Sequence, residues 1–194
     1  MAPGSPARLP AAVDVPDRPE LVVRLWQVAD APALTEAVTS SVEHLRPFMP
    51  WIAPEPMSAA DRAGMIAAHL DEWASGGDGF YGLWLDGRAV GALGAHHRIA
   101  PDGLELGYWL RADVVGRGIV TSAVGSVTQA LLELPHITHV EIRMDEANTR
   151  SVAVSRRCGY RLIARERRQV EAPAETGWGL VWRFGADPQP APAG

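Results

Sequence analysis

The order in which strand-like and helix-like segments follow one another most constrains the fold of this chain. Apolar residues recur with the two-residue period of strands in some segments and with the three-to-four-residue period of helices in others. The expected order is strand, two helices, three strands, helix, strand, helix and two strands. A hairpin-rich first half followed by one strand–helix–strand crossover is typical of an α+β fold with a mixed sheet.

Local signals set the boundaries of these segments. Asp30 and Ser58 suit helix N-caps, Gly159 can end a short helix, and Asp86-Gly87 between two apolar runs predicts a tight hairpin. The expected strands cover residues 20–26, 80–85, 89–98, 104–110, 139–144, 160–170 and 177–184, and the expected helices cover residues 30–45, 117–134, 149–158 and a segment that opens at Ser58.

Length and composition indicate one globular domain. The chain has 194 residues, of which 47% are hydrophobic and 21% charged, enough apolar material for a sizeable core. Residues 1–19 are rich in proline and glycine, and we expect them to form an extended arm outside the core. Residues 186–194 are expected to form a flexible tail, which leaves 20–185 as the folded domain. No apolar run is long enough for a membrane span, so no membrane partner is expected.

The charge balance and the single cysteine narrow the function classes. The 18 basic residues are all arginine, and with 23 acidic residues the net charge is −5. An acidic chain is a poor candidate for nucleic-acid binding and favours a cationic acceptor. Cys158 alone can form neither an internal disulfide nor a cysteine-based zinc site, and no metal is expected. Without a signal peptide pattern at the N-terminus, we expect a cytoplasmic protein.

The segment that bears chemistry runs from Leu104 to Thr121. A strand-like run leads into Gly116-Arg117-Gly118, where a helix begins. Glycines allow close approach of a ligand, and free backbone N–H groups at a helix N-terminus favour an anion such as pyrophosphate. A glycine turn that only tightens the packing of strand and helix is the alternative. Thr121 breaks the dinucleotide fingerprint, and the absence of lysine excludes a Walker A loop.

Six pieces in order resemble the GCN5-related N-acetyltransferase (GNAT) superfamily and, within it, the RimJ/RimL-like branch. They are HLRPFMPW (44–51), ELGYWL (105–110), GRGIVT (116–121), VEIRM (140–144), an N-x-x-S pattern at Asn148 and Ser151, and RRCGYRL (156–162). The resemblance covers residues 20–185. It implies a mixed sheet of about seven strands and about four helices, splayed where acetyl-CoA or another acyl-CoA lies between strands 104–110 and 139–144.

The resemblance also implies which residues hold the acyl-CoA. The pyrophosphate would rest on the amides of Gly116, Arg117, Gly118, Ile119, Val120 and Thr121. The pantetheine arm would lie along Leu110 and Arg111, with an N–H of Trp109 or Leu110 facing the thioester and Asn148 as a polar contact. Asn148 also suits a helix N-cap. The chain departs from the family pattern at Asp113, where Gln or Arg is common, and at Val115, where an aromatic residue is common.

Catalysis by a member of this family needs a base for the amine and a proton donor for the leaving thiolate. Glu105 is the candidate base, because a carboxylate beside aromatic residues can accept a proton; the alternative is an ion pair with an arginine across the sheet. His96 and His97 are further candidates, although strand histidines are more often structural. Ser151 is the candidate acid or hydrogen-bond donor to sulfur, and a capping hydroxyl is its alternative.

The resemblance implies an N-acyltransferase that moves an acetyl group to a primary amine, either a small molecule or a protein N-terminus. Phe48, Trp51, Phe80 and Tyr81 come from segments that line the acceptor cleft in the family. Alternatives are a succinyl-CoA-type acyltransferase, a non-catalytic acyl-CoA sensor or scaffold, and a nucleotide-binding protein. The C-terminal strand 177–184 is a candidate contact for a homodimer.

Overall fold

The computed structural model describes residues 8–186, and one mixed sheet organises them. In this part of the chain eight strands pair in the order β1-β2-β3-β4-β5-β6-β8-β7, and β5 and β6 are the one parallel pair. The α+β fold predicted from the sequence is therefore confirmed, with β1 as an additional short strand. The strands are β1 (Ala12–Val13), β2 (Leu21–Leu25), β3 (Gly79–Leu85), β4 (Arg88–Ala100), β5 (Gly103–Leu110), β6 (His139–Asp145), β7 (Arg161–Arg167) and β8 (Trp178–Gly185).

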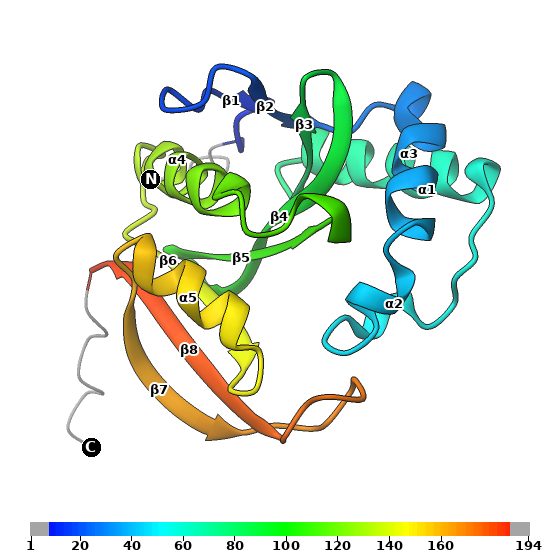
Figure 1. Ribbon diagram of the computed structural model, residues 1–194. Helices are drawn as coiled ribbons and strands as arrows, with labels where there is room; N and C mark the ends of the chain where they lie inside the picture. The colour runs from blue at the N-terminus through cyan, green and yellow to red at the C-terminus, as the bar shows by residue number, and fades with distance from the viewer. Residues whose placement is uncertain (1–7, 187–194) are drawn as a thin grey trace.

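Helices cover the two faces of the sheet unequally. Figure 1 shows α4 and α5 together on one side and α1, α2 and α3 gathered on the other. One core cluster lies beneath α4, and a second packs α1 and α3 against the N-terminal strands. The helices are α1 (Ala31–Thr39), α2 (Val42–Leu45), α3 (Ala59–Ala74), α4 (Ile119–Leu132) and α5 (Thr149–Arg157), with short 3-10 turns at Val28–Asp30, Pro50–Ile52 and Ala112–Val114.

The turns and caps predicted from local signals are present. Asp86 and Gly87 both have positive φ, at 50° and 77°, as a two-residue hairpin of the primed type requires. Ser58 caps α3 by accepting a hydrogen bond from the Asp61 amide. Gly159 follows α5 with φ of 79°. These elements form where the sequence places them because their signals act within a few residues.

The helix expected over residues 30–45 is broken in two. α1 ends at Thr39, and the non-helical Ser41 precedes α2. The Ser41 side chain is buried, and its hydroxyl accepts a hydrogen bond from the Ala112 amide at 3.3 Å. This contact with the segment after β5 stabilises the break, because a serine bonded to a distant amide need not continue the helix.

The N-terminal arm does not lie outside the core, contrary to expectation. Leu9, Val13 and Val15 are buried in the cluster beneath α4, and β1 pairs with β2. The Trp73 indole donates to the Leu9 carbonyl at 2.8 Å. Apolar positions between the prolines thus cover an edge of the sheet. Residues 1–7 and the tail beyond Ala186 lie outside the described residues.

The central feature of the fold is the separation of β5 from β6. Their pairing covers three register positions, from Gly103 opposite His139 to Glu105 opposite Glu141. Beyond them β5 continues to Leu110 beside β4, and β6 continues beside β8. This is the splayed sheet that the family resemblance implies. Among residues 8–186 there is no helix with the length and apolarity to cross a membrane.

Candidate active site

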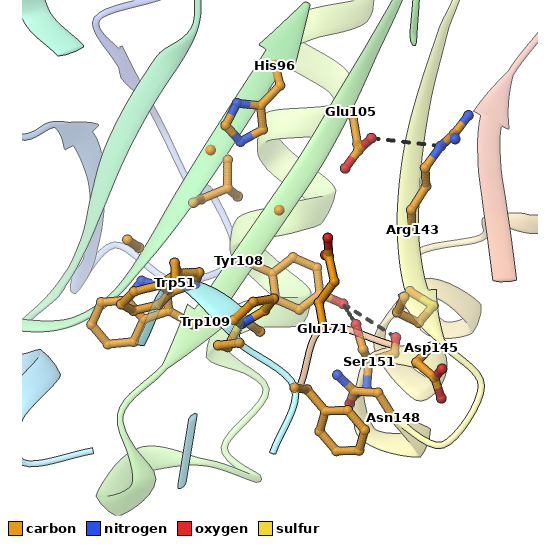
Figure 2. A pocket seen from close by; sticks show the side chains of 18 of the residues that line it. Trp51, His96, Glu105, Tyr108, Trp109, Arg143, Asp145, Asn148, Ser151 and Glu171 are labelled. Carbon is orange, nitrogen blue, oxygen red and sulfur yellow. Dashed lines mark hydrogen bonds and ion pairs between the residues drawn. The ribbon is translucent and has the colours of Figure 1, made fainter. Parts of the chain in front are cut away.

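A cavity of about 930 Å³ opens where β5 and β6 separate. It is lined by β4, β5, β6 and α5, by the 3-10 turn at Pro50–Ile52, and by the segment between β7 and β8. Figure 2 shows His96 and Glu105 projecting at one end of this pocket and Tyr108, Asn148 and Ser151 toward the other. A concave site that combines apolar walls with a few polar groups is the usual form of a small-molecule site.

The gap exposes backbone groups of β5. The Arg111 amide donates to the Val90 carbonyl of the neighbouring strand segment. Because N–H groups alternate along an antiparallel pair, those of Trp109 and Gly107 also face β4. The amides of Tyr108 and Leu110 then face the gap. Of the two amides that the resemblance implies for the thioester, that of Trp109 therefore points toward β4 and that of Leu110 faces the gap. The side chain of Trp109 lines the cavity.

The glycine turn presents a row of free amides. Gly116 and Gly118 have φ of 78° and 76°, and Gly118 is the N-cap of α4. The first amide to bond back into this turn is that of Ser122, which donates to the Gly118 carbonyl. Within the described residues the amides of residues 116–121 make no such bond. A Cβ built on Gly116 would meet no atom within 4 Å, so the space beside this glycine is open, whereas one built on Gly118 would lie 3.2 Å from the Arg18 guanidinium.

Asp113, the acidic departure from the family pattern, is held by two guanidinium groups. Its carboxylate contacts Arg111 at 3.1 Å and Arg88 at 3.0 Å. The Arg111 hydrogen bond, above all, lowers the pKa of Asp113. Arg18 of the N-terminal arm reaches the turn itself and donates to the Arg117 carbonyl at 2.5 Å. The guanidinium of Arg18 therefore lies beside the turn. The sequence did not predict this contact, because residues 1–19 were expected to lie outside the core.

Tyr108 and Ser151 form a pair of hydroxyls across the gap. The Tyr108 Oη lies 2.7 Å from the Ser151 Oγ, and burial raises the pKa of Tyr108 well above its usual value. The phenol is thus a neutral proton donor. Asn148 caps α5, its Oδ1 accepting from the Ser151 amide at 3.2 Å. Sequence reasoning missed Tyr108 because strand alternation placed it opposite the face of Glu105; only the departure of β6 lets it reach Ser151.

Glu105 is engaged in a network of ion pairs across the sheet. Its carboxylate accepts a hydrogen bond from Arg98 and lies 3.8 Å from Arg143. Arg143 in turn contacts Glu141, which also binds Arg183. The ion-pair alternative for Glu105 is therefore the arrangement in the structure, although the carboxylate still lines the cavity. Arg98 contacts one carboxylate oxygen and Arg143 lies near the other, so neither oxygen is left without a guanidinium neighbour for an incoming amine.

His96 has a different environment at the same end of the cavity. Its Nδ1 lies 2.6 Å from the Asp78 Oδ2, while the His97 amide donates to the Asp78 Oδ1 at 2.8 Å. Burial alone would raise the pKa of Asp78, but the hydrogen bonds from His97 and His96 lower it overall. Asp78 is therefore an ionised acceptor for the imidazole. His96 lines the cavity and His97 does not.

Three of the four aromatic residues expected on the acceptor side line the cavity. Phe48, Trp51 and Phe80 do so, and the Trp51 ring lies 5.9 Å from that of Trp109. Tyr81 does not: its ring is fully buried in the core, and its hydroxyl donates to the Pro10 carbonyl. Strand alternation explains the correction, because Phe80 and Tyr81 point to opposite faces of β3.

Cys158 does not line the cavity. Burial raises the pKa of the Cys158 thiol, which keeps it in the unreactive neutral form. Tyr160 is buried in the core with its hydroxyl 2.6 Å from that of Thr128. Across residues 8–186 no group of three or more His, Cys, Asp or Glu side chains could hold a metal ion.

Comparisons with known proteins agree with this geometry. Residues 20–161 match the family model described as an acetyltransferase (GNAT) domain. A protein from Bacillus subtilis (strain 168), provisionally named a ribosomal N-acetyltransferase, is 27% identical over 142 residues, 72% of this chain and 77% of that protein.

Two solved structures share the fold. A microcin C7 self-immunity acetyltransferase in complex with acetyl-CoA and AMP has a TM-score of 0.82 at 18% identity, covering 93% of this chain and 99% of that one. An acetyltransferase from Salmonella typhimurium, described as modifying the N-terminal serine of ribosomal protein L7/L12, has a TM-score of 0.77 at 18% identity, covering 91% and 99%.

Proposed function

The chain belongs to the GNAT acetyltransferase family, and from that premise we propose that it transfers an acetyl group from acetyl-CoA to a primary amine. The transfer takes place in a ternary complex without a covalent enzyme intermediate. The half-buried Cys158 agrees with this, because it does not line the cavity and burial raises the pKa of its thiol, which keeps it neutral.

The observation that carries the proposal is the gap between β5 and β6 with the glycine turn at its end. Free amides of residues 116–121 suit a pyrophosphate, and Arg18 beside them adds positive charge. The outward amides of Tyr108 and Leu110 suit a pantetheine arm that lies along β5 like an added strand. Asp113 does not oppose the phosphates, since Arg88 and Arg111 neutralise it. The residues present therefore fit an acyl-CoA.

When bound, acetyl-CoA supplies an acetyl group activated as a thioester. The protein orients that group and stabilises the charge that develops on its oxygen, for which the gap-facing amides of β5 are suited. Tyr108 and Ser151 share a hydrogen bond at the first turn of α5. We assign this hydroxyl pair to proton donation toward the leaving sulfur, with Tyr108 as the neutral donor behind Ser151.

We propose a peptide N-terminus as the acceptor. The relatives named or described as ribosomal N-acetyltransferases support a protein acceptor, and the aromatic wall of Phe48, Trp51 and Phe80 offers an apolar surface for the first side chain of a peptide. A small amine and a succinyl donor are the competing assignments. A cytoplasmic location, the homodimer through residues 177–184 and the end of the domain at residue 185 stay predictions.

Melting temperatures with acetyl-CoA, succinyl-CoA, CoA, NAD and ATP test the donor site. A ligand at one hundred times its dissociation constant stabilises a protein by about 2.7 kcal/mol, so CoA compounds should raise the melting temperature and NAD or ATP should not. Gly116→Leu should abolish the rise. Gly87→Leu is the matched control, because Gly87 has nearly the same positive φ and equally open surroundings in the hairpin between β3 and β4.

Mass spectrometry of short peptides with free N-terminal Ser or Ala, together with small amines, then tests the acceptor. An increase in mass by one acetyl group on the peptides supports the proposal. A melting shift with CoA but no turnover on any amine favours the sensor or scaffold alternative. If no CoA compound changes the melting temperature, the proposed function is refuted.

A further inference from the structure

With Glu105 engaged by arginines, the side chain of His96 at the same end of the cavity is the group best placed to accept a proton. We propose that His96, oriented by Asp78, is the general base that removes a proton from the acceptor amine. This assignment rests on the proposed function, and it gives Asp78 the role of a positioning residue.

The hydrogen bonds around Asp78 determine which imidazole nitrogen is free. Both carboxylate oxygens are in use: Oδ1 accepts from the His97 amide at 2.8 Å, and Oδ2 lies 2.6 Å from the His96 Nδ1. An ionised carboxylate can only accept, so Nδ1 must carry the proton. The lone pair of the neutral ring is then on Nε2, whereas the ring's hydrogen bond among residues 8–186 is made at Nδ1.

Two glycines place Nε2 over the bare surface of the sheet. Gly94 of β4 and Gly107 of β5 are paired in register. A Cβ built on Gly94 would lie 2.4 Å from the Nε2 of His96, and one built on Gly107 would lie 3.9 Å from it. The imidazole therefore reaches across positions without side chains, on the face that lines the cavity. Figure 2 shows the ring of His96 projecting into this pocket.

Charged and titratable groups surround His96 from β4, β5 and α3 and from Asp78, the residue just before β3. Glu105 lies directly opposite in the strand register, but Arg98 and Arg143 engage its carboxylate. Asp78 is the carboxylate in direct contact with the ring, and His97 shares that carboxylate from the next position. From α3, His69 also lines the cavity. The Asp78–His96 pair shares no hydrogen bond with the arginine network among the described residues, although the charge of Asp78 also acts on Arg98.

The step is a proton transfer that balances by itself. The acceptor ammonium gives one proton to the Nε2 lone pair, which leaves a neutral amine with its own lone pair for attack and an imidazolium stabilised by Asp78. The imidazolium later returns the proton to water. Neither an oxidant nor a metal is needed.

Enzyme kinetics against pH test the catalytic part. In the holoenzyme with acetyl-CoA and the best peptide acceptor of the panel, His96→Gln should lower kcat/KM by about 100-fold to 1,000-fold and remove the acid limb of its pH profile. The rise in melting temperature with CoA should not change. His136→Gln is the matched control: His136 is exposed between α4 and β6 and does not line the cavity, so activity should stay within about twofold.

Nitrogen NMR of the histidine rings tests the positioning part without turnover. The neutral ring of His96 should carry its proton on Nδ1, and Asp78→Asn should shift the equilibrium toward the Nε2–H form. Gly94→Ala should move the His96 ring signals because its methyl group would overlap Nε2, whereas Gly107→Ala, at contact distance, should leave them in place.

Different results would refute the role of His96 and the proposed acetyl transfer. A native chain that transfers acetyl groups, with a His96→Gln variant that keeps the acid limb and most of its rate, would overturn the assignment. So would a neutral His96 with its proton on Nε2. A native chain that neither binds CoA nor transfers an acetyl group would instead refute the proposed function, and the role of His96 would fall with it.

Discussion

At the scale of single residues, the same side-chain type serves structure or chemistry according to its partners. Ser151 is both the residue whose amide bonds to the helix cap Asn148 and the hydroxyl that meets Tyr108. Glu105 and Asp78 are both carboxylates at one end of the cavity, yet arginines engage the first and an imidazole contacts the second. Ion pairing holds Glu105 in place, whereas Asp78 leaves a free nitrogen on its partner.

Removing either hydroxyl of the Tyr108–Ser151 pair should slow the chemical step. We expect Tyr108→Phe and Ser151→Ala each to lower kcat about 100-fold or more, with little change in the melting shift caused by CoA, because general acid catalysis contributes roughly 100-fold to 10,000-fold. The double variant should be scarcely slower than the worse single variant, since the two groups act as one unit. Steady-state kinetics of the three variants measure this. Fully additive losses would contradict a shared proton path.

At the scale of elements, the end of β6 is held to the loop before β8 by one buried carboxylate. Asp145 accepts from the amides of Ala147, Thr176 and Gly177 at 2.9, 2.9 and 3.0 Å, and from the Thr176 hydroxyl. Burial alone would raise the pKa of Asp145, but these hydrogen bonds lower it overall. The cavity wall at this point therefore depends on an ionised side chain.

Asp145→Asn should destabilise the fold by about 2 kcal/mol near neutral pH, since hydrogen bonds to a charged group contribute roughly 1.5–3 kcal/mol. The folded-state pKa lies below the unfolded value of about 3.9, so the carboxylate's contribution is complete above that pH and is lost as the pH falls through the folded value. Urea denaturation at pH 7, 5 and 3.5 should show the difference between native and variant shrinking at the lowest pH. A constant difference would contradict the role, and Asp86→Asn, in an exposed turn, is the control.

What the sequence could predict at this scale depends on how far each cause reaches along the chain. The Asp86-Gly87 hairpin, the Ser58 cap and the glycine turn before α4 arise from neighbouring residues, and all were predictable. The break at Ser41 depends on the Ala112 amide, 71 positions away. The contact between His96 and Asp78 spans 18 positions and the hairpin of β3 and β4. Pairings of this kind require the folded sheet, so the sequence showed candidate bases without showing their partners.

At the scale of the whole molecule, the two halves of the sheet meet over three residue pairs of β5 and β6. The N-terminal half lies between α4 and the layer of α1 and α3, and the C-terminal half carries α5. A ligand in the gap contacts both halves and the glycine turn. Binding of a ligand therefore stabilises the gap between β5 and β6, where the strands are not paired. Ligand binding at this one place then raises the free energy of unfolding of the whole domain.

Hydrogen exchange of single amides should report this coupling, with β5 supplying its own internal control. Without ligand, the gap-facing amides of Tyr108 and Leu110 should exchange rapidly, while those of Gly107 and Trp109, directed toward β4, should exchange slowly. CoA at one hundred times its dissociation constant should slow the first pair about 100-fold, together with the amides of residues 116–121, and leave the second pair almost unchanged. Protection of the glycine turn with no change at Tyr108 and Leu110 would mean that the ligand is held by its phosphates alone. The pantetheine arm would then not follow β5, and the acyl group would have to be oriented by side chains of the cavity instead.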